Sequence, residues 1–336
     1  MKVHLFMGSW KCVEKSGVGE AIHHQESMLN SMHIDVTHRF ERDASLVHIN
    51  TIFPSSFFAS LFARLSGKTV LYYGHSTMED FRNSFKGSNR LSFLFKCWIR
   101  FCYFTGNAIV TPTEYSKNLL LSYGTRTPIY VLTNGVDTDF FAPDPEYRRT
   151  FREKYGIRDD EKAVISVGHY MARKGIMEFI ELAKAMPDVR FFWFGYTKFN
   201  LIPEEISEAI QNPPPNLVFP GYVGREELRD AYCGCDLFCF MSHEETEGIV
   251  VLEALASGIP VMVRDIPVYE GWLTDGENVY KGHDHKSFME KAEAILEGRV
   301  PNLTKAGLKV AESHSIPNTG QKLMEIYQDV KEASRE

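Results

Sequence analysis

Residues 163–186, AVISVGHYMARKGIMEFIELAKAM, contain the pattern that decides the fold of this chain. An apolar run of strand length, residues 164–167, is followed by a short loop and then by an amphipathic run of helix length, residues 175–186. The same alternation recurs along the sequence, for example at residues 46–50 and 54–65. Strands that alternate with helices form parallel sheets with helices on their faces, so the sequence predicts the α/β class.

The length of the chain predicts two domains, because 336 residues exceed what one ordinary hydrophobic core holds. We expect a first domain over residues 1–143, with strands near residues 2–7, 46–50, 69–73, 107–111 and 129–132. We expect a second domain over residues 144–315, with strands near residues 163–167, 189–194, 216–219, 236–241, 260–263 and 278–281. We also expect a last helix within residues 316–336. The sequence is compatible with its packing on either domain, including a return to the first. Ligands bind beyond the carboxyl ends of parallel strands, so two such sheets with facing loops enclose a cleft.

The composition indicates a soluble globular protein with no membrane-spanning segment. The chain is 44% hydrophobic and 24% charged, and no run approaches the roughly 20 apolar residues that cross a bilayer. Residues 1–10 read as a first buried strand and lack the pattern of a secretory signal peptide, so we expect the chain in the cytoplasm.

The six cysteines do not form a disulfide framework in a chain of this size, and reduced thiols are expected. Cys233, Cys235 and Cys239, together with His243, form a candidate metal site. Their spacing matches no common zinc pattern, and residues 237–240 read as a buried strand in which a free cysteine acts as a small hydrophobe. We therefore expect no metal.

The segment SHEETEGIVVLEA, residues 242–254, follows an expected strand and opens an expected helix. Gly248 allows backbone to approach a ligand closely, and the free N–H groups at the helix start suit an anion such as a diphosphate. The carboxylates of Glu245 and Glu253 are placed to hydrogen-bond sugar or ribose hydroxyls. The alternative is a solvated charge run in front of an ordinary helix.

A second loop, residues 168–175, brings Arg173 and Lys174 to the start of another helix. Two cations in such a loop neutralise the charge of a leaving diphosphate. The alternative is a basic helix start that faces solvent, although positive charge there opposes the helix dipole.

Three further candidates follow expected strands. Gly17 and Gly19 lie in KSGVG, residues 15–19, which is not a G-x-G-x-x-G dinucleotide motif and is also compatible with an ordinary tight turn. His75 ends a strand, where a single histidine is as often structural as functional. Val223, in GYV after residues 217–219, belongs either to a ligand-binding turn or to an ordinary one.

Residues 82–112 contain no acidic side chain and combine cations with aromatic rings. The candidate membrane-binding residues are Arg82, Lys86, Arg90, Lys96, Trp98 and Arg100. Each cation near an anionic leaflet contributes about 1 kcal/mol, so five suffice for reversible attachment to an anionic membrane surface. The alternative is a core helix with solvated cations. No nucleic acid is expected as a partner, because the whole chain has a net charge of −7 and contains no recognised binding module.

These motifs resemble those of the family 4 retaining glycosyltransferases. Glu245 and Glu253, with seven residues between them, match the family's E-x7-E motif, and Lys174 matches the lysine of its G-R-x(n)-K-G element. At the position of the usual arginine this chain has His169, which leaves Arg173 as the candidate substitute. The resemblance covers nearly the whole chain and implies the GT-B fold, in which two Rossmann-like parallel-sheet domains face each other across a cleft.

The resemblance also implies a role for each candidate residue. The first domain, 1–143, binds the acceptor and faces the membrane, and the second, 144–315, binds the nucleotide-sugar. The donor-binding set implied is Gly17, Gly19, Gly168, Val223, Gly248, Ile249, Val250 and Glu253. The catalytic set implied is Glu245, His75, Lys174 and Arg173.

Within this family, the chain is similar to bacterial glycolipid synthases that add a second hexose to monoglucosyl-diacylglycerol. That similarity implies transfer of galactose or glucose from a UDP-sugar to a glycolipid acceptor, with retention of configuration, without a metal, and at the inner face of the cell membrane. Three rival functions are transfer to a polysaccharide or other soluble acceptor, a catalytically inactive nucleotide-sugar sensor, and a sugar-nucleotide epimerase.

Overall fold

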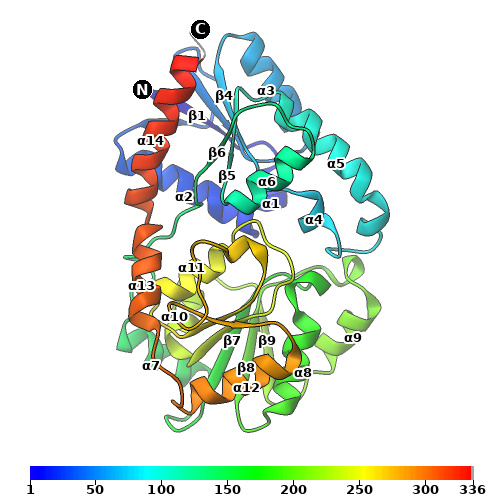
Figure 1. Ribbon diagram of the computed structural model, residues 1–336, viewed down its shortest axis with the longest axis vertical. Coiled ribbons are helices and arrows are strands. Elements are labelled where there is room, and N and C mark those ends of the chain that lie inside the picture. Colours follow the sequence, from blue (N-terminus) through cyan, green and yellow to red (C-terminus); the bar gives the residue numbers. More distant parts are fainter. Residues whose placement is uncertain (334–336) are drawn as a thin grey trace.

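Every strand predicted from the sequence is present, and the strands form two parallel six-stranded sheets (Figure 1). The computed structural model describes residues 1–333. The first sheet has the order β2-β1-β3-β4-β5-β6. Its strands are β1 (Lys2–Phe6), β2 (Asp35–Thr37), β3 (Leu46–Ile49), β4 (Thr69–Tyr73), β5 (Ala108–Thr111) and β6 (Ile129–Val131).

The second sheet has the order β12-β11-β10-β7-β8-β9. Its strands are β7 (Ala163–Val167), β8 (Arg190–Phe194), β9 (Leu217–Gly221), β10 (Leu237–Phe240), β11 (Val261–Arg264) and β12 (Tyr280–Gly282). The predicted α/β architecture of two Rossmann-like sheets is thereby confirmed. Strand β2 was not predicted, because a three-residue edge strand that pairs only with β1 is too short to show a period-two pattern.

Helices cover both faces of each sheet. Those that belong to the first half of the chain are α1 (Trp10–Val13), α2 (Gly17–Ser31), α3 (Pro54–Leu65), α4 (Met78–Phe81), α5 (Ser88–Phe104) and α6 (Glu114–Ser122). The others are α7 (Pro145–Tyr155), α8 (Ile176–Ala185), α9 (Glu204–Gln211), α10 (Arg225–Gly234), α11 (Ile249–Ala256), α12 (His285–Leu296), α13 (Thr304–Ser313) and α14 (Ile316–Ala333). Three short 3-10 turns complete the fold: η1 (Ala172–Lys174), η2 (Phe199–Leu201) and η3 (Pro267–Tyr269).

The segment 163–186 shows how the sequence produces this arrangement. All five residues of β7 are buried, as expected for a central parallel strand covered on both faces. Helix α8 buries Ile176, Phe179, Ile180, Leu182 and Ala183, which lie on one face at helical spacing. That face packs on the sheet, so the strand and the helix share one core.

In both sheets the strand order reverses next to the strands that carry the candidate loops. In the first sheet β1 lies between β2 and β3, and in the second β7 lies between β10 and β8. The loops after β1, β7 and β10 therefore leave neighbouring strand ends at topological switch points, where open parallel sheets bind ligands.

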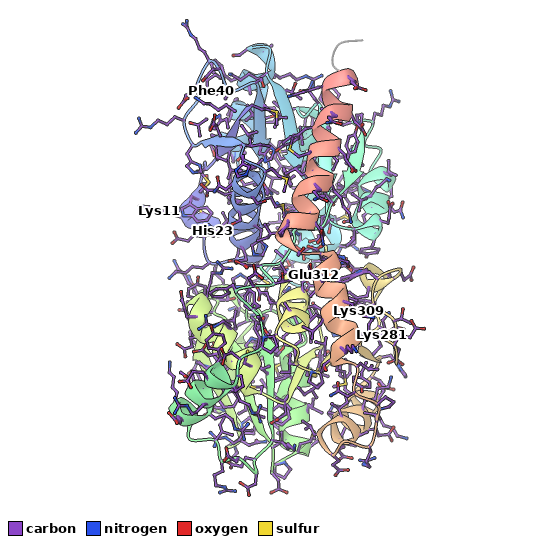
Figure 2. The ribbon with its side chains drawn as sticks, turned by 90° about the vertical axis from the view of Figure 1, so that its left-hand side faces the viewer. Lys11, His23, Phe40, Lys281, Lys309 and Glu312 are labelled. Atoms are coloured by element: carbon purple, nitrogen blue, oxygen red, sulfur yellow. The ribbon has the colours of Figure 1, made fainter. Side chains whose placement is uncertain are left out.

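The chain crosses between the two domains twice, at neighbouring positions. Val136 and Ser315 form an isolated parallel bridge, in which the Val136 N–H donates to His314 O at 3.0 Å and the Ile316 N–H donates to Val136 O at 3.0 Å. After the second crossing α14 packs on α2 in the first domain, where Leu323 and Tyr327 join the core. Figure 2 shows α14 along the first domain and α13, with Lys309 and Glu312, along the second.

Among residues 1–333, no helix combines the length and the hydropathy required to span a bilayer.

Gly175 tests the packing of the loop between β7 and α8 against β10. Its φ is +76°, and a Cβ there would lie 2.4 Å from Met241 O. We expect Gly175→Ala to lower the free energy of unfolding by about 2–5 kcal/mol, since a left-handed residue costs about 1–2 kcal/mol and overpacking about 1–3 kcal/mol. Gly67→Ala is the matched control, because Gly67 has a φ of +73° with open space around it. Equal losses in urea titrations of the two variants would contradict this account.

Candidate active site

A cleft of about 410 Å³ lies between the two domains, and most of the predicted site residues line it. The predicted residues that line it are Gly17, His75, Gly168, Arg173, Lys174, Val223, Glu245, Gly248, Ile249, Val250 and Glu253. Gly19 is not among the lining residues. It packs against α1, where a Cβ would lie 2.4 Å from Val13 O, so its backbone contact is internal to the fold.

A buried ion pair joins the two loops of the second domain. Lys174 Nζ lies 2.5 Å from Glu245 Oε1, and the two side chains are 13% and 7% exposed. Burial opposes ionisation of Glu245, but the Lys174 and Arg173 cations outweigh it and lower the pKa of the carboxyl. Burial lowers the pKa of Lys174, partly offset by the same carboxylate. The pair places a charged carboxylate and an ammonium at one point of the cleft.

Arg173 joins the two domains. Its Nη2 lies 2.9 Å from Asp80 Oδ1, its Nε donates to Ser84 Oγ at 2.9 Å, and its Nη1 donates to Glu244 O at 3.0 Å. Asp80 and Ser84 belong to the first domain. Glu244 belongs to the second domain and directly precedes Glu245, the carboxylate of the ion pair. The guanidinium therefore fixes the acidic loop relative to the segment that leads into α5.

His169 lines the cleft at the position of the family's usual arginine. Its Nδ1 lies 2.8 Å from Tyr196 O, and burial lowers the pKa of its ring. An imidazole with a lowered pKa does not replace the permanent positive charge of an arginine. In this part of the cleft the cations are Arg173 and Lys174.

Helix α11 begins at Ile249 and points its N-terminus into the cleft. Gly248 precedes it with a φ of +93°, which favours glycine, and no side chain caps the helix. The first N–H groups of a helix lack intrahelical acceptors, so Ile249 and Val250 offer donors and a positive dipole end to an anion.

Glu253 lies one helical turn further along α11 and is 4% exposed. Tyr232 Oη donates to its Oε2 at 2.8 Å. Burial, together with the nearby Glu20 of the first domain, raises the pKa of Glu253 to about 7. The carboxyl faces the cleft as a hydrogen-bonding group rather than as a solvated charge.

His75 is held at the opposite wall. Its Nε2 lies 2.9 Å from Asn50 Oδ1, and Asn50 in turn exchanges two hydrogen bonds with Gln25. Burial lowers the pKa of His75 to about 4, so the ring is neutral near pH 7.

The other acidic residues of the segment 242–254 contact the first domain. Glu247 is 3% exposed, accepts from Asn134 N at 3.0 Å and from Asn134 Nδ2 at 2.7 Å, and is also hydrogen-bonded by Thr133 Oγ1. Tyr115 Oη donates to Glu244 Oε1 at 2.9 Å. These carboxylates are therefore not a solvated charge run. The interpretation from sequence did not include Glu244, Glu247 or Asp80, because nothing in a single segment indicates its partners in the other domain.

Val223 lines the cleft next to Tyr222, over whose ring Lys15 Nζ lies at 5.0 Å from the centroid. The loop after β1 thus meets the turn after β9 across the cleft. Gly195 allows the strand ends to approach, since a Cβ there would lie 2.2 Å from Gly168 O.

The cysteine cluster is part of the core. Cys235 and Cys239 are buried, and residues 237–240 form the predicted strand β10. All six cysteines are free. Within residues 1–333, no group of three or more His, Cys, Asp or Glu side chains is arranged to hold a metal ion.

The basic aromatic segment, residues 82–112, contains α5, which lies on the outside of the first domain (Figure 1). Of its six candidate membrane-binding residues, Arg82, Lys86, Arg90 and Arg100 are exposed. Lys96 and Trp98 are half-buried: Lys96 lies over the Tyr123 ring, and Trp98 donates to Ile52 O at 2.6 Å. The exposed large apolar side chains on α5 are Leu91, Phe93, Leu94, Phe101 and Phe104.

Two protein families match this chain. The family described as "Glycosyl transferases group 1" matches residues 147–309, and "Glycosyltransferase Family 4" matches residues 29–140. The processive diacylglycerol alpha-glucosyltransferase of Acholeplasma laidlawii is 37% identical over 337 residues, which cover 100% of both chains. The alpha-galactosylglucosyldiacylglycerol synthase of Streptococcus pneumoniae is 28% identical over 311 residues, 88% of this chain and 79% of that protein.

Solved structures share the fold. A crystal structure of Anabaena HepE in complex with UDP-glucose superposes with a TM-score of 0.75 at 16% identity and covers 98% of this chain and 100% of that one. Sucrose-phosphate synthase from Thermosynechococcus elongatus gives a TM-score of 0.79 at 14% identity, with coverage of 99% and 100%. The shared architecture is the two-domain GT-B fold expected from the sequence.

The buried carboxyls of the cleft predict how stability depends on pH. Burial raises the pKa of Glu244, Glu247 and Glu253 to about 7, from an ordinary value of 4.5. A carboxyl with a raised pKa in the folded protein stabilises the fold fully below pH 4.5, and this contribution is lost as the pH rises through 7. The free energy of unfolding of the wild type therefore falls between pH 5 and 8. We expect this fall to be smaller in Glu247→Gln, by on the order of 3 kcal/mol.

Urea titrations at several pH values check this. They measure how steeply the free energy of unfolding changes with pH, and a loss of stability that the substitution causes equally at every pH does not alter that slope. A variant whose stability declines as steeply as that of the wild type would show that Glu247 is ionised in the folded protein throughout this range.

Proposed function

This chain belongs to family 4 of the glycosyltransferases, and we propose that it transfers galactose or glucose from a UDP-hexose to a membrane glycolipid such as monoglucosyl-diacylglycerol. The observation that carries the proposal is the cleft in which the Glu245–Lys174 pair lies beside the free N-terminus of α11. The printed names of the relatives from Acholeplasma laidlawii and Streptococcus pneumoniae support diacylglycerol glycolipids as the class of acceptor.

In this proposal residues 144–315 hold the donor. The diphosphate lies at the N–H groups of Ile249 and Val250, within reach of the Lys174 ammonium. Glu253 holds the ribose, and the backbone at Val223 meets the uracil. Gly17 and Gly168 leave room for the phosphates and the sugar between the two domains.

Residues 1–143 hold the acceptor opposite the donor. We assign Glu245 to the donor hexose, because its buried carboxylate accepts hydrogen bonds from sugar hydroxyls while Lys174 balances its charge. His75, neutral near pH 7, is assigned to a hydroxyl of the same sugar from the first domain. We assign Arg173 to holding the cleft closed, which its contacts with Asp80 and Glu244 O support, and to the charge of the leaving diphosphate.

The reaction itself retains the configuration of the sugar. The acceptor hydroxyl attacks the anomeric carbon on the face that the diphosphate leaves, and the departing phosphate oxygen accepts the hydroxyl proton. Lys174, Arg173 and the helix N-terminus stabilise the charge that develops on the diphosphate. Positioning and exclusion of water by the closed domains supply the remainder, since water would otherwise hydrolyse the donor.

Transfer of label tests the proposal. UDP-[14C]galactose and UDP-[14C]glucose are incubated separately with the protein and monoglucosyl-diacylglycerol in anionic vesicles, and label in chloroform-extractable lipid is counted. We expect label from one donor and a loss of at least about 100-fold in Glu245→Ala, because a charged group that contacts the reacting sugar is removed. Glu205→Ala, on the exposed side of α9, is the matched control.

Unlabelled lipid from both donors, with UDP binding intact by calorimetry, would reject the glycolipid assignment. The same donors would then be offered with polysaccharide acceptors. Conversion of UDP-glucose to UDP-galactose without any acceptor would indicate an epimerase.

The proposed membrane contact makes a separate prediction. Lys86, Arg90 and Arg100 are exposed on the outer side of the first domain. Replacing all three by Gln should weaken binding to vesicles that contain phosphatidylglycerol by about 100-fold, since each cation contributes about 1 kcal/mol. Lys305, Lys309 and Lys322, exposed on α13 and α14, are replaced by Gln in the control variant, which changes the net charge equally. Vesicle sedimentation that weakens equally in both variants would show that net charge, not this surface, determines binding.

A further inference from the structure

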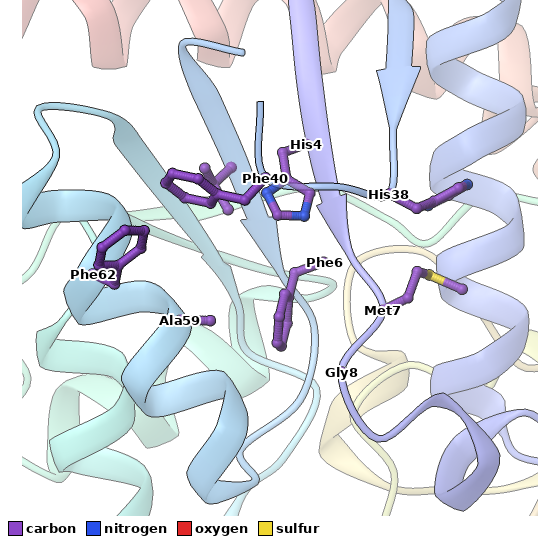
Figure 3. A pocket seen from close by; sticks show the side chains of 9 residues that line it. His4, Phe6, Met7, Gly8, His38, Phe40, Ala59 and Phe62 are labelled. Carbon is purple, nitrogen blue, oxygen red and sulfur yellow. The ribbon is translucent and has the colours of Figure 1, made fainter. Parts of the chain in front are cut away.

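A second pocket, of about 420 Å³, lies in the first domain outside the cleft (Figure 3). His4 and Phe6 of β1 form its floor, Ala59 and Phe62 of α3 form one wall, and Phe40 of the β2–β3 loop closes part of its mouth. Its volume is in the usual range for small-molecule sites, and most of its lining is apolar.

The pocket exists because β1 is covered unequally on its two faces. Val3 of β1 packs into the core beneath α2 and α14. On the other face, the core under α3 and α5 is built on β3, β4 and β5, which leaves His4 and Phe6 at its edge. Aromatic rings border the remaining space: the Phe40 centroid lies 4.8 Å from that of Phe62 and 5.7 Å from that of His4.

The wall formed by α3 is also apolar on its outer side. Its sequence, PSSFFASLFARL, has a single charged residue, Arg64. The side chains of Phe58, Phe62 and Leu65 are 65%, 57% and 79% exposed. A helix on a protein surface ordinarily turns polar residues outward, so an exposed apolar patch of this kind marks an interaction site.

This outer side is continuous with the exposed side of α5. Arg64 Nη1 donates to Phe104 O at 3.1 Å, and Ser60 Oγ lies 2.5 Å from Thr105 Oγ1. Phe101 and Phe104 at the end of α5 are 63% and 71% exposed. The mouth of the pocket therefore adjoins the surface that we propose lies on the membrane.

The segment that follows β1 lines first this pocket and then the cleft. Met7 and Gly8 line the pocket, and the chain continues through α1 to residues 14–17, which line the cleft. A Cβ at Gly8 would lie 2.2 Å from the Phe6 ring, so this loop packs directly against the pocket floor. One short segment thus borders both spaces.

We propose that this pocket binds one acyl chain of the glycerolipid acceptor, while the sugar headgroup enters the cleft. The inference rests on the proposed transfer to a glycolipid. In this proposal the protein itself recognises an acyl chain of the lipid. One acyl chain leaves the bilayer along α3, and the loop after β1 separates this acyl chain from the headgroup.

Dependence on chain length tests the pocket. Transfer is measured in mixed micelles at saturating UDP-hexose, with monoglucosyl-diacylglycerol that carries either oleoyl or hexanoyl chains. Ala59 is half-buried on the pocket wall, at the border of the core under α3 and α5, so Ala59→Phe places a ring in the pocket. We expect kcat/KM to fall about tenfold with oleoyl chains and less than twofold with hexanoyl chains. Leu61→Phe is the matched control, because it adds a ring to the same helix at an exposed position outside the pocket.

A photolabel supplies a readout that does not need turnover. Monoglucosyl-diacylglycerol with a diazirine in the middle of one chain is irradiated with the full-length protein, and the cross-linked peptides are identified by mass spectrometry. We expect cross-links to residues 38–40 and 59–62 that disappear in Ala59→Phe. Wild-type transfer with unchanged chain-length dependence in Ala59→Phe, and cross-links on α5 alone, would overturn the pocket and leave the proposed function intact. Absence of transfer with cross-links in the pocket would overturn the proposed function and retain the lipid site.

Discussion

The buried pair of Glu245 and Lys174 is the constraint on which the site depends. Transfer of a carboxylate or an ammonium out of water costs several kcal/mol per ion, and only close pairing offsets that cost. The two residues meet because β10 and β7 are neighbours in the second sheet, so the loops at their carboxyl ends leave side by side. The parallel topology therefore selects the partners, and the pair then fixes the two loops that form the wall of the cleft.

The same acidic loop also determines how the domains meet. Glu244 contacts Tyr115, Thr113 Oγ1 donates to Thr246 O at 2.9 Å, and Glu247 contacts Asn134. The chain also crosses twice between the domains, at the Val136–Ser315 bridge. Separation of the domains would break the carboxylate contacts and expose their buried groups to water, so these hydrogen bonds hold the two domains together.

Much of the fold and part of the site were predictable from the sequence, because both depend on local patterns. Apolar runs of strand length that alternate with amphipathic runs predicted eleven of the twelve strands, and the motifs after β7 and β10 predicted Lys174, Glu245 and the start of α11. Contacts between distant segments were not predictable. The Asp80 partner of Arg173 lies 93 positions away in the sequence, and no local pattern distinguishes a cation that binds a ligand from one that joins two domains.

Which individual aromatic rings are buried was likewise not predictable from the sequence. Trp98 and the exposed Phe101 lie in the same aromatic helix, yet Trp98 packs against Phe57 between α3 and α5. Amphipathic periodicity identifies a buried stripe, but it does not reveal that a neighbouring helix, α3, leaves its own outer side apolar. That side became visible only when the two helices were placed together.

The distribution of charge provides an orientation for the proposed membrane contact. Residues 1–145 carry 14 Lys and Arg against 12 Asp and Glu, whereas the rest of the chain carries 23 against 32. Charges act on an anionic surface only within about a Debye length, roughly 8 Å at physiological ionic strength, so in the proposed contact the exposed cations of residues 82–112 decide binding rather than the net charge of −7. In the orientation that we propose, residues 144–315 face the solvent that supplies UDP-hexose and residues 1–143 face the lipid.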